Sequence, residues 1–106
     1  MNTPYIIVLV TAKDDAEAKA IAQGLLQEKL IACANILPEI QSLFWWEGKI
    51  DSASEVLLVL KTKKSLFKRL EAAVKKLHSY KTPEIIALPI VAGNPNYLRW
   101  ISKSVY

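Results

Sequence analysis

Residues 31–62 read IACANILPEIQSLFWWEGKIDSASEVLLVLKT, and this stretch decides the fold because it places two extended segments in succession. Its first half is rich in branched and aromatic side chains, which favour strands, and Pro38 is expected to bend it because proline has no N–H for the ladder. We expect a turn at Glu47-Gly48 and then a polar connection over residues 51–54. The chain returns as EVLLVLKT (55–62), so the sequence predicts two consecutive strands with no helix between them.

A strand and a helix are expected before this stretch. Residues 5–11, YIIVLVT, are apolar and branched but too few for a helix. Asp14 then suits a helix N-cap, and Glu17, three residues later, is placed to complete a capping box. The helix is expected to end near Lys29. Its apolar stripe consists of Ala18, Ile21, Ala22, Leu25 and Leu26.

A helix, a strand and a short helix are expected after it. The second helix starts at Ser65, and Pro83 forces the residue before it out of helical geometry. EIIALPIV (84–91) is predicted to be the last strand. Asn94-Pro95 suits the N-cap and first position of a helix over residues 96–103. The stripe of the second helix consists of Leu66, Phe67, Leu70, Val74 and Leu77.

The order of elements is therefore strand, helix, strand, strand, helix, strand and a C-terminal helix. This order is typical of the split βαβ arrangement and predicts an α+β, ferredoxin-like βαββαβ sandwich, with helices on one face of an antiparallel sheet. The 106 residues have a globular composition, 52% hydrophobic and 23% charged, without a linker that would divide them. We expect residues 1–106 to form a single domain.

Apolar and polar residues do not alternate along the predicted strands as they would in a sheet with one face exposed to solvent. In YIIVLV, VLLVL and IIALPIV, apolar side chains point to both faces, whereas one layer of helices covers only one face. Burial of a large aliphatic side chain contributes about 1.5–3 kcal/mol, so an exposed second face would be unfavourable. The sequence therefore predicts an obligate homo-oligomer, in which another copy of the chain covers this face.

Composition and charge exclude several classes of protein. The single cysteine, Cys33, rules out a disulfide-stapled scaffold. The apolar run from Tyr5 lacks the basic start of a signal peptide and the ~20 apolar residues of a membrane span, so we expect a cytoplasmic protein without a membrane partner. Net charge is +4, and between Lys61 and Lys81 eight Lys or Arg residues face one acid, Glu71. Such a cluster attracts nucleic acid or forms a solvated helix face.

Several separated motifs give the chain a family resemblance. They are Ala32-Cys33-Ala34-Asn35, Trp46-Glu47-Gly48-Lys49-Ile50, Lys61-Thr62, His78 with Tyr80, Pro83-Glu84, and Tyr97-Leu98 with Trp100-Ile101. In these motifs the chain resembles the CutA divalent-cation tolerance proteins, over residues 5–101. The resemblance implies a homotrimer of ferredoxin-like protomers, similar in shape to trimeric nitrogen-signalling regulators, whose ligands sit in clefts between subunits. It also implies a non-enzymatic role in tolerance of divalent cations such as copper; a small-molecule-sensing trimer without a physiological metal is the alternative.

The family resemblance suggests a metal site, and Cys33 and His78 are the candidate ligands, because copper and zinc favour thiolate and imidazole. The paired spacings of a closed zinc site are absent, so a site would gather these residues and Glu84 from adjoining chains. No cofactor is required, and binding of copper or another divalent cation is expected to be weak. Where family members credited with copper binding have a further cysteine and a histidine doublet, this chain has Val10 and Leu77. The alternatives are an apolar packing role for the cysteine and a helix C-cap for the histidine.

A polar cleft for a small ligand is the second candidate site. A binding site for a small molecule is typically an apolar concavity in which a small number of polar groups converge. The alternative for Lys61 and Glu84 is an ordinary ion pair at the sheet edge. The predicted cleft residues are Trp46, Lys61, Tyr80 and Glu84, with His78 beside them.

The two tryptophans of the bent ribbon have two interpretations. Trp45 and Trp46 should point to opposite faces of a strand, so that one packs in its own chain and the other anchors a neighbour. Alternatively, both complete the local core.

Two other functions are disfavoured. An enzyme is not expected, because no glycine-rich oxyanion or phosphate loop and no paired carboxylates accompany Cys33. RNA-recognition modules share this element order but need aromatic residues on the third strand. Since EVLLVLKT (55–62) has no aromatic residue and no glycine, a nucleic-acid partner is not expected.

Overall fold

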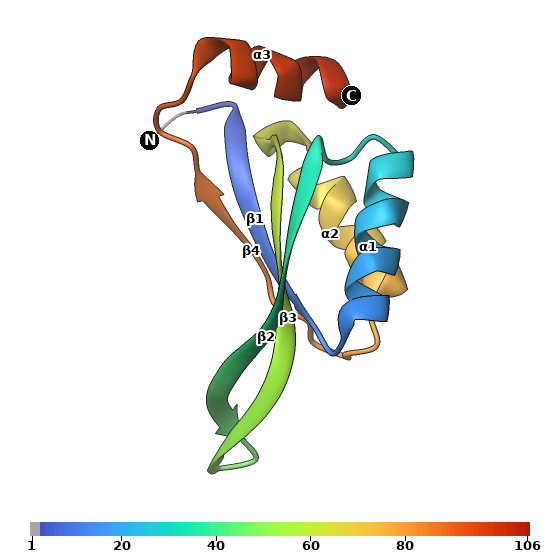
Figure 1. Cartoon of the computed structure of the whole chain (residues 1–106), viewed down its shortest axis with the longest axis vertical. Coiled ribbons are helices and arrows are strands. Elements are labelled where there is room, and N and C mark those ends of the chain that lie inside the picture. The colour runs from blue at the N-terminus through green and yellow to red at the C-terminus, as the bar shows by residue number, and fades with distance from the viewer. Residues whose placement is uncertain (1–2) are drawn as a thin grey trace.

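A four-stranded antiparallel sheet and three α-helices make up residues 3–106, the part of the chain that the computed structural model describes (Figure 1). The elements are β1 (Tyr5–Ala12), α1 (Asp15–Gln27), β2 (Cys33–Trp46), β3 (Lys49–Lys63), a 3₁₀ turn (Lys64–Leu66), α2 (Phe67–Leu77), β4 (Ile85–Pro89) and α3 (Pro95–Ser104). The strand order is β2-β3-β1-β4, which interleaves two βαβ units. The predicted α+β class and order of elements are confirmed, whereas the homotrimer stays a prediction.

The first and last helices begin at the predicted caps. Asp14 Oδ1 accepts the backbone N–H of Glu17 at 2.8 Å. Glu17 Oε1 accepts the N–H of Lys13 at 3.1 Å, so the capping box closes one residue further back than expected. Asn94 Oδ1 likewise accepts two N–H groups in the first turn of α3. None of the helices within residues 3–106 has the length and apolar composition that a membrane span needs.

Two boundaries differ from the expectation. The second helix begins at Phe67 rather than Ser65, because the N–H of Lys64 still donates to Pro4 O beside β1 (2.8 Å) and a 3₁₀ turn follows. The last strand is shorter than predicted, since β4 covers Ile85–Pro89.

β2 and β3 form a longer hairpin than the sequence predicts. Glu47 (φ 50°) and Gly48 (φ 77°) both take left-handed backbone conformations, as a two-residue hairpin turn requires, so pairing resumes at the next residue. The expected polar connection over residues 51–54 is therefore wrong, because these residues belong to β3. The bend at Pro38 is confirmed as a shift in register. We call residues 41–54 the arm; Figure 1 shows it projecting beyond the helices.

One face of the sheet holds the core, and we call it the covered face. Val8, Leu58 and Leu60 are fully buried there. They pack with side chains from α1 and α2, which lie side by side over this face (Figure 1). The buried helix residues are Ile21, Leu25, Leu70 and Val74.

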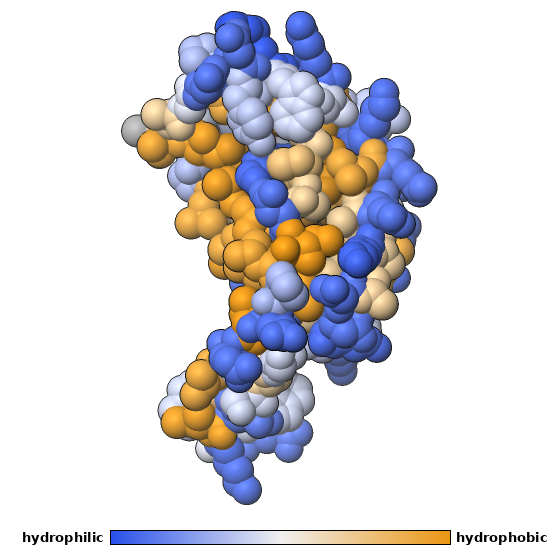
Figure 2. Space-filling model, in the orientation of Figure 1, coloured by the Kyte–Doolittle hydropathy of each residue, from blue (hydrophilic) through white to orange (hydrophobic). Residues whose placement is uncertain are grey.

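The opposite face is also apolar but has no layer of helices over it. We call it the uncovered face; the strand register assigns to it Ile7, Leu9, Leu57, Val59, Ile86 and Leu88. Ile86 and Leu88 are 51% and 46% exposed. α3 reaches only one end of this face, where Tyr5 and Ser102 share a hydrogen bond of 2.7 Å. Figure 2 shows hydrophobic atoms gathered on the β4 side of the molecule and on the arm. The prediction of a sheet that is apolar on both faces is confirmed.

Candidate functional site

A cleft of about 870 Å³ lies between the arm and the segment that joins α2 to β4. Antiparallel pairing sets Phe44 opposite Asp51, and strand alternation puts both on the same side as Glu55 and Leu57. The cleft therefore continues the uncovered face along the arm. The joining segment contributes Tyr80, Lys81, Thr82 and Glu84 to the lining.

Three of the four predicted cleft residues line this cleft. They are Trp46, Tyr80 and Glu84. Lys61 instead lies beside Cys33 on the neighbouring strand, and its ammonium group donates to Asn35 Oδ1. The alternative ion pair between Lys61 and Glu84 is not found within residues 3–106. The structure thus assigns Lys61 to a different part of the sheet.

A partly buried hydrogen bond joins two residues that line the cleft. The Tyr80 hydroxyl donates to Glu55 Oε2 at 2.8 Å, and Glu55 is only 8% exposed. Burial, together with the hydrogen bond and the negative charge of Glu55, raises the pKa of Tyr80 to about 12. The phenol is therefore a proton donor to the carboxylate throughout the physiological range.

His78 holds the tyrosine in place. The imidazole is fully buried, its Nε2 lies 2.7 Å from Thr11 O, and its Nδ1 lies 3.0 Å from the backbone N of Tyr80. A backbone N–H only donates, so Nδ1 accepts and Nε2 carries the proton donated to Thr11 O. The ring also packs on Tyr80, with centroids 4.7 Å apart. The imidazole thus bonds to β1 and the joining segment, not to the last carbonyls of α2 as the capping alternative expected.

Glu17 fastens the same segment to α1. Its Oε2 accepts the N–H of Ser79 at 2.9 Å, while Oε1 accepts that of Lys13. Burial alone would raise the pKa of Glu17, but the hydrogen bonds from Ser79 and Lys13 hold that pKa below its ordinary value. One carboxylate therefore caps a helix and positions a wall of the cleft.

The candidate metal ligands lie at different ends of the sheet within one chain. Cys33 and Ile7 both pair with Lys61, whereas His78 bonds to Thr11, roughly 13 Å further along β1 at about 3.4 Å per residue. Within residues 3–106 no three or more His, Cys, Asp or Glu side chains are grouped to hold a metal ion. A metal site of Cys33, His78 and Glu84 would need adjoining chains and stays a prediction.

Cys33 has a partner of its own. Its Sγ lies 3.6 Å from the Tyr97 hydroxyl of α3. This hydrogen bond, with burial, raises the pKa of Tyr97. The thiol is only partly buried in this chain, and both its role as a metal ligand and its alternative as a packing residue stay predictions.

Neither tryptophan of the arm packs into the core of its own chain. Trp45 is 73% exposed and Trp46 is 61% exposed. The alternative in which both complete the local core is therefore wrong, as is the internal packing of one of them. Their rings stay available to a ligand or to a neighbouring chain.

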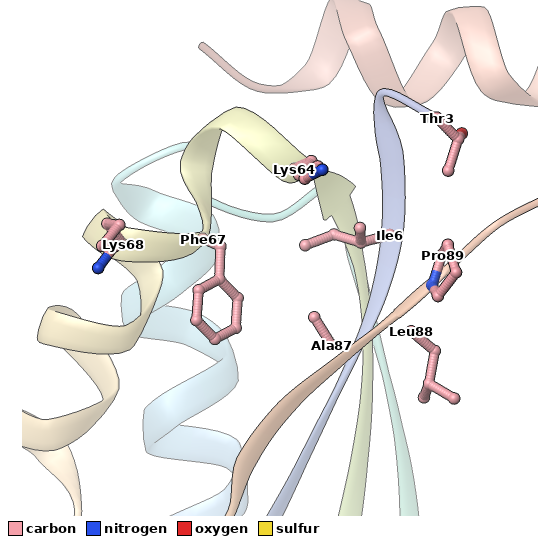
Figure 3. Close-up of a pocket in the computed structure, with 8 residues that line it drawn as sticks. All are labelled: Thr3, Ile6, Lys64, Phe67, Lys68, Ala87, Leu88 and Pro89. Carbon is pink, nitrogen blue, oxygen red and sulfur yellow. The ribbon is translucent and has the colours of Figure 1, made fainter. Parts of the chain in front are cut away.

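A smaller groove of about 440 Å³ lies between α2 and the free edge of β4 (Figure 3). Figure 3 shows Phe67 pointing from α2 toward Ala87, with Lys64 above them. The lining is mostly apolar and its charges come only from Lys64 and Lys68. It brings together none of the predicted site residues, so the larger cleft is the better candidate.

Among the lining residues that the sequence does not predict are one aromatic residue, Phe44, and two carboxylates, Asp51 and Glu55. The sequence predicts a polar connection at Asp51 and places Phe44 in a strand without a further role. Glu55 opens an apolar strand, and a charged residue at such a border is the one signal in the sequence that could have found it.

Comparisons with known proteins agree with this fold. Residues 6–104 match the family model described as CutA1 divalent ion tolerance protein. The chain is 46% identical to protein CutA 1, chloroplastic, of Oryza sativa over 97% of its own length and 58% of the rice protein, so it spans little more than half of that relative. It is 42% identical to the divalent-cation tolerance protein CutA of Escherichia coli K12 over 98% of this chain and 93% of the other. The crystal structure of CutA1 from Oryza sativa superposes with a TM-score of 0.95 at 45% identity, covering 98% and 95% of the two chains. The chain belongs to the CutA1 divalent ion tolerance family.

Proposed function

We propose that the chain acts in tolerance of divalent cations, copper among them, as a homotrimer that binds a metal ion or a small ligand in clefts between its subunits. One observation carries the proposal: the cleft beside Tyr80 continues the uncovered face of the sheet. A subunit that covers this face would therefore also close the cleft. Family membership supports the link to divalent cations.

The exposed apolar surface supports the assembly. Ile86 and Leu88 on β4 and Trp45 and Trp46 on the arm are all more than two-fifths exposed. Burial of each large apolar side chain contributes about 1.5–3 kcal/mol, which favours association through this surface. Three copies are proposed on the family resemblance.

The proposed role is binding rather than catalysis. A cysteine nucleophile needs a nearby base, and His78 lies at the other end of the sheet from Cys33. The proposed location is the cytoplasm. The rice relative is named as chloroplastic, so location varies within the family.

Native mass spectrometry of protein purified gently from cells tests the proposal. We expect the mass of three chains together with a small bound species. Glu84→Gln should reduce the bound fraction, because Glu84 lines the cleft, whereas Glu71→Gln removes a carboxylate on α2 outside it. Single chains at micromolar concentration, or a trimer that carries nothing in either variant or wild type, would contradict the proposal.

Direct metal binding has a separate test. Copper and zinc are titrated into wild type, Cys33→Ala and His78→Ala, after circular dichroism has established that each variant is folded. If the proposed ligands act, both substitutions lower the affinity. Equal stoichiometry and affinity in all three proteins would reject these two side chains as ligands.

A further inference from the structure

We infer that the cleft beside Tyr80 binds a small organic cation, an ammonium group on an apolar or aromatic body. The inference rests on the proposed function, because it names the ligand class of the same cleft. Asp51, Glu55 and Glu84 supply three carboxylates to the lining, against one ammonium group from Lys81. The chain as a whole carries a net charge of +4, so the cleft is an acidic region of a basic protein.

Glu55 points most directly to a positive ligand. It is more than nine-tenths buried, and within residues 3–106 no cationic side chain lies within ion-pair distance of it. Its Oε2 accepts the Tyr80 hydroxyl, whereas no described residue donates to Oε1. Since every fully buried side-chain nitrogen or oxygen among the described residues has a partner, Oε1 is not fully buried, and Glu55 is one of the residues that line the cleft. Oε1 is therefore open to a further hydrogen-bond donor, and a carboxylate with no counter-charge beside it favours a cationic donor.

The aromatic lining distinguishes an organic cation from a metal ion. Phe44, Trp46 and Tyr80 all line the cleft, and Trp46 is largely exposed there. The face of an aromatic ring attracts an ammonium group, and the same rings bury the apolar body of a ligand. A bare metal ion would gain little from these rings, and within residues 3–106 the carboxylates are too dispersed to form a cluster of three ligands.

The size of the cleft sets the size of the ligand. Small-molecule sites enclose roughly 300–1,000 Å³. A volume of about 870 Å³ lies within that range and is shaped by side chains from the arm and the joining segment. The cleft therefore has room for a small molecule.

The affinities of three similar compounds that differ in charge test the inference. The probes are 2-phenylethylammonium, 2-phenylethanol and 3-phenylpropanoate, which share a phenyl ring and differ mainly in charge. Each is titrated by calorimetry into the assembled wild-type protein at low salt. We expect the ammonium compound to bind about tenfold more tightly than the alcohol, and the carboxylate to bind least.

Matched variants locate the effect. Glu55→Gln should bring the ammonium compound and the alcohol to similar affinity. Glu84→Gln, at an exposed position, is the second variant should Glu55→Gln fail to fold, and it should lower the preference in the same direction. Glu71→Gln, which removes a carboxylate outside the cleft, should keep the full preference.

Several outcomes would overturn the inference. Equal affinity for the three probes would do so, as would absence of heat with the ammonium compound at millimolar concentration. A neutral or anionic species found in the cleft by native mass spectrometry would reject this ligand class and leave the proposed function standing. A trimer without any bound species, together with copper tolerance that Glu84→Gln leaves unchanged, would instead reject the proposed function itself.

Discussion

Leu57 and Leu58 are neighbours in β3 with the same side chain, yet they lie in different surroundings. Leu58 is fully buried beneath α1 and α2. Leu57 lies on the uncovered face, between Leu37 of β2 and Thr11 of β1, and is partly exposed. An apolar face thus stabilises the fold of one chain on one side of the sheet and leaves surface for association on the other. Apolar composition alone does not show which face of a sheet is buried in the chain; the position of the helices does.

Truncation of a side chain on the covered face should lower the free energy of unfolding the most. Leu58→Ala removes buried methyl groups and leaves a cavity in the core beside its cross-strand neighbour Val10, so we expect the free energy of unfolding to fall by about 2–5 kcal/mol. Urea unfolding measures the loss, which should be the same at every protein concentration. A loss below about 1 kcal/mol would mean that the core closes around the missing side chain.

The same truncation on the uncovered face should behave differently. Leu57→Ala should lower the free energy of unfolding by about 1–2 kcal/mol, because less area is withdrawn from water in one chain. The loss should grow with protein concentration, since association adds stability only where partners are present. Unfolding at several concentrations checks this. If Leu57→Ala and Leu58→Ala had equal effects at all dilutions, the two faces would not differ as described.

Local signals in the sequence predicted much of the framework. Asp14, Asn94 and the turn at Glu47-Gly48 each act within a few residues, and each lies where it was expected. The uncovered face was predictable for a similar reason, because strand alternation is a property of each segment alone. Interactions of short range are therefore well represented in the sequence pattern.

The arm and the cleft were harder to predict. Three of the four residues 51–54 are polar, so the hydrophobic pattern that marks a strand is absent there. Glu55 and Tyr80 are 25 positions apart, and only the packed fold brings the hydroxyl to the carboxylate. For the same reason the sequence placed Lys61 in a cleft that the structure forms without it.

Loss of the Glu17 charge should lower the free energy of unfolding by a smaller amount, and that amount should depend on pH. The native carboxylate has a pKa below its ordinary value of 4.5, because its hydrogen bonds outweigh the effect of burial. Its stabilisation is therefore fully present above about pH 4.5 and is lost as pH falls through the native pKa. Glu17→Gln should lower the free energy of unfolding by about 1 kcal/mol at pH 7, since neutral hydrogen bonds replace charged ones. The difference in the free energy of unfolding between the two proteins should become smaller in acid. Urea titrations from pH 7 to 3 measure it. A constant difference across that range would contradict this role of Glu17.

Gly24→Ala should change the free energy of unfolding the least, and it should raise rather than lower it. Gly24 lies in α1 where this helix meets α2 over the covered face, and a Cβ there would come within 2.9 Å of Leu77 Cδ1. Alanine in a helix is favoured over glycine by about 0.5–1 kcal/mol, and Leu77 is 44% exposed, so its terminal methyl group is free to turn away. We expect a net gain of about 0.5 kcal/mol in the free energy of unfolding, measured by urea at fixed protein concentration. Gly24→Val is the matched control, because its branched side chain would push α2 itself and should destabilise the protein. A loss of stability in Gly24→Ala would show that the contact between the two helices is too rigid to yield even at its exposed edge.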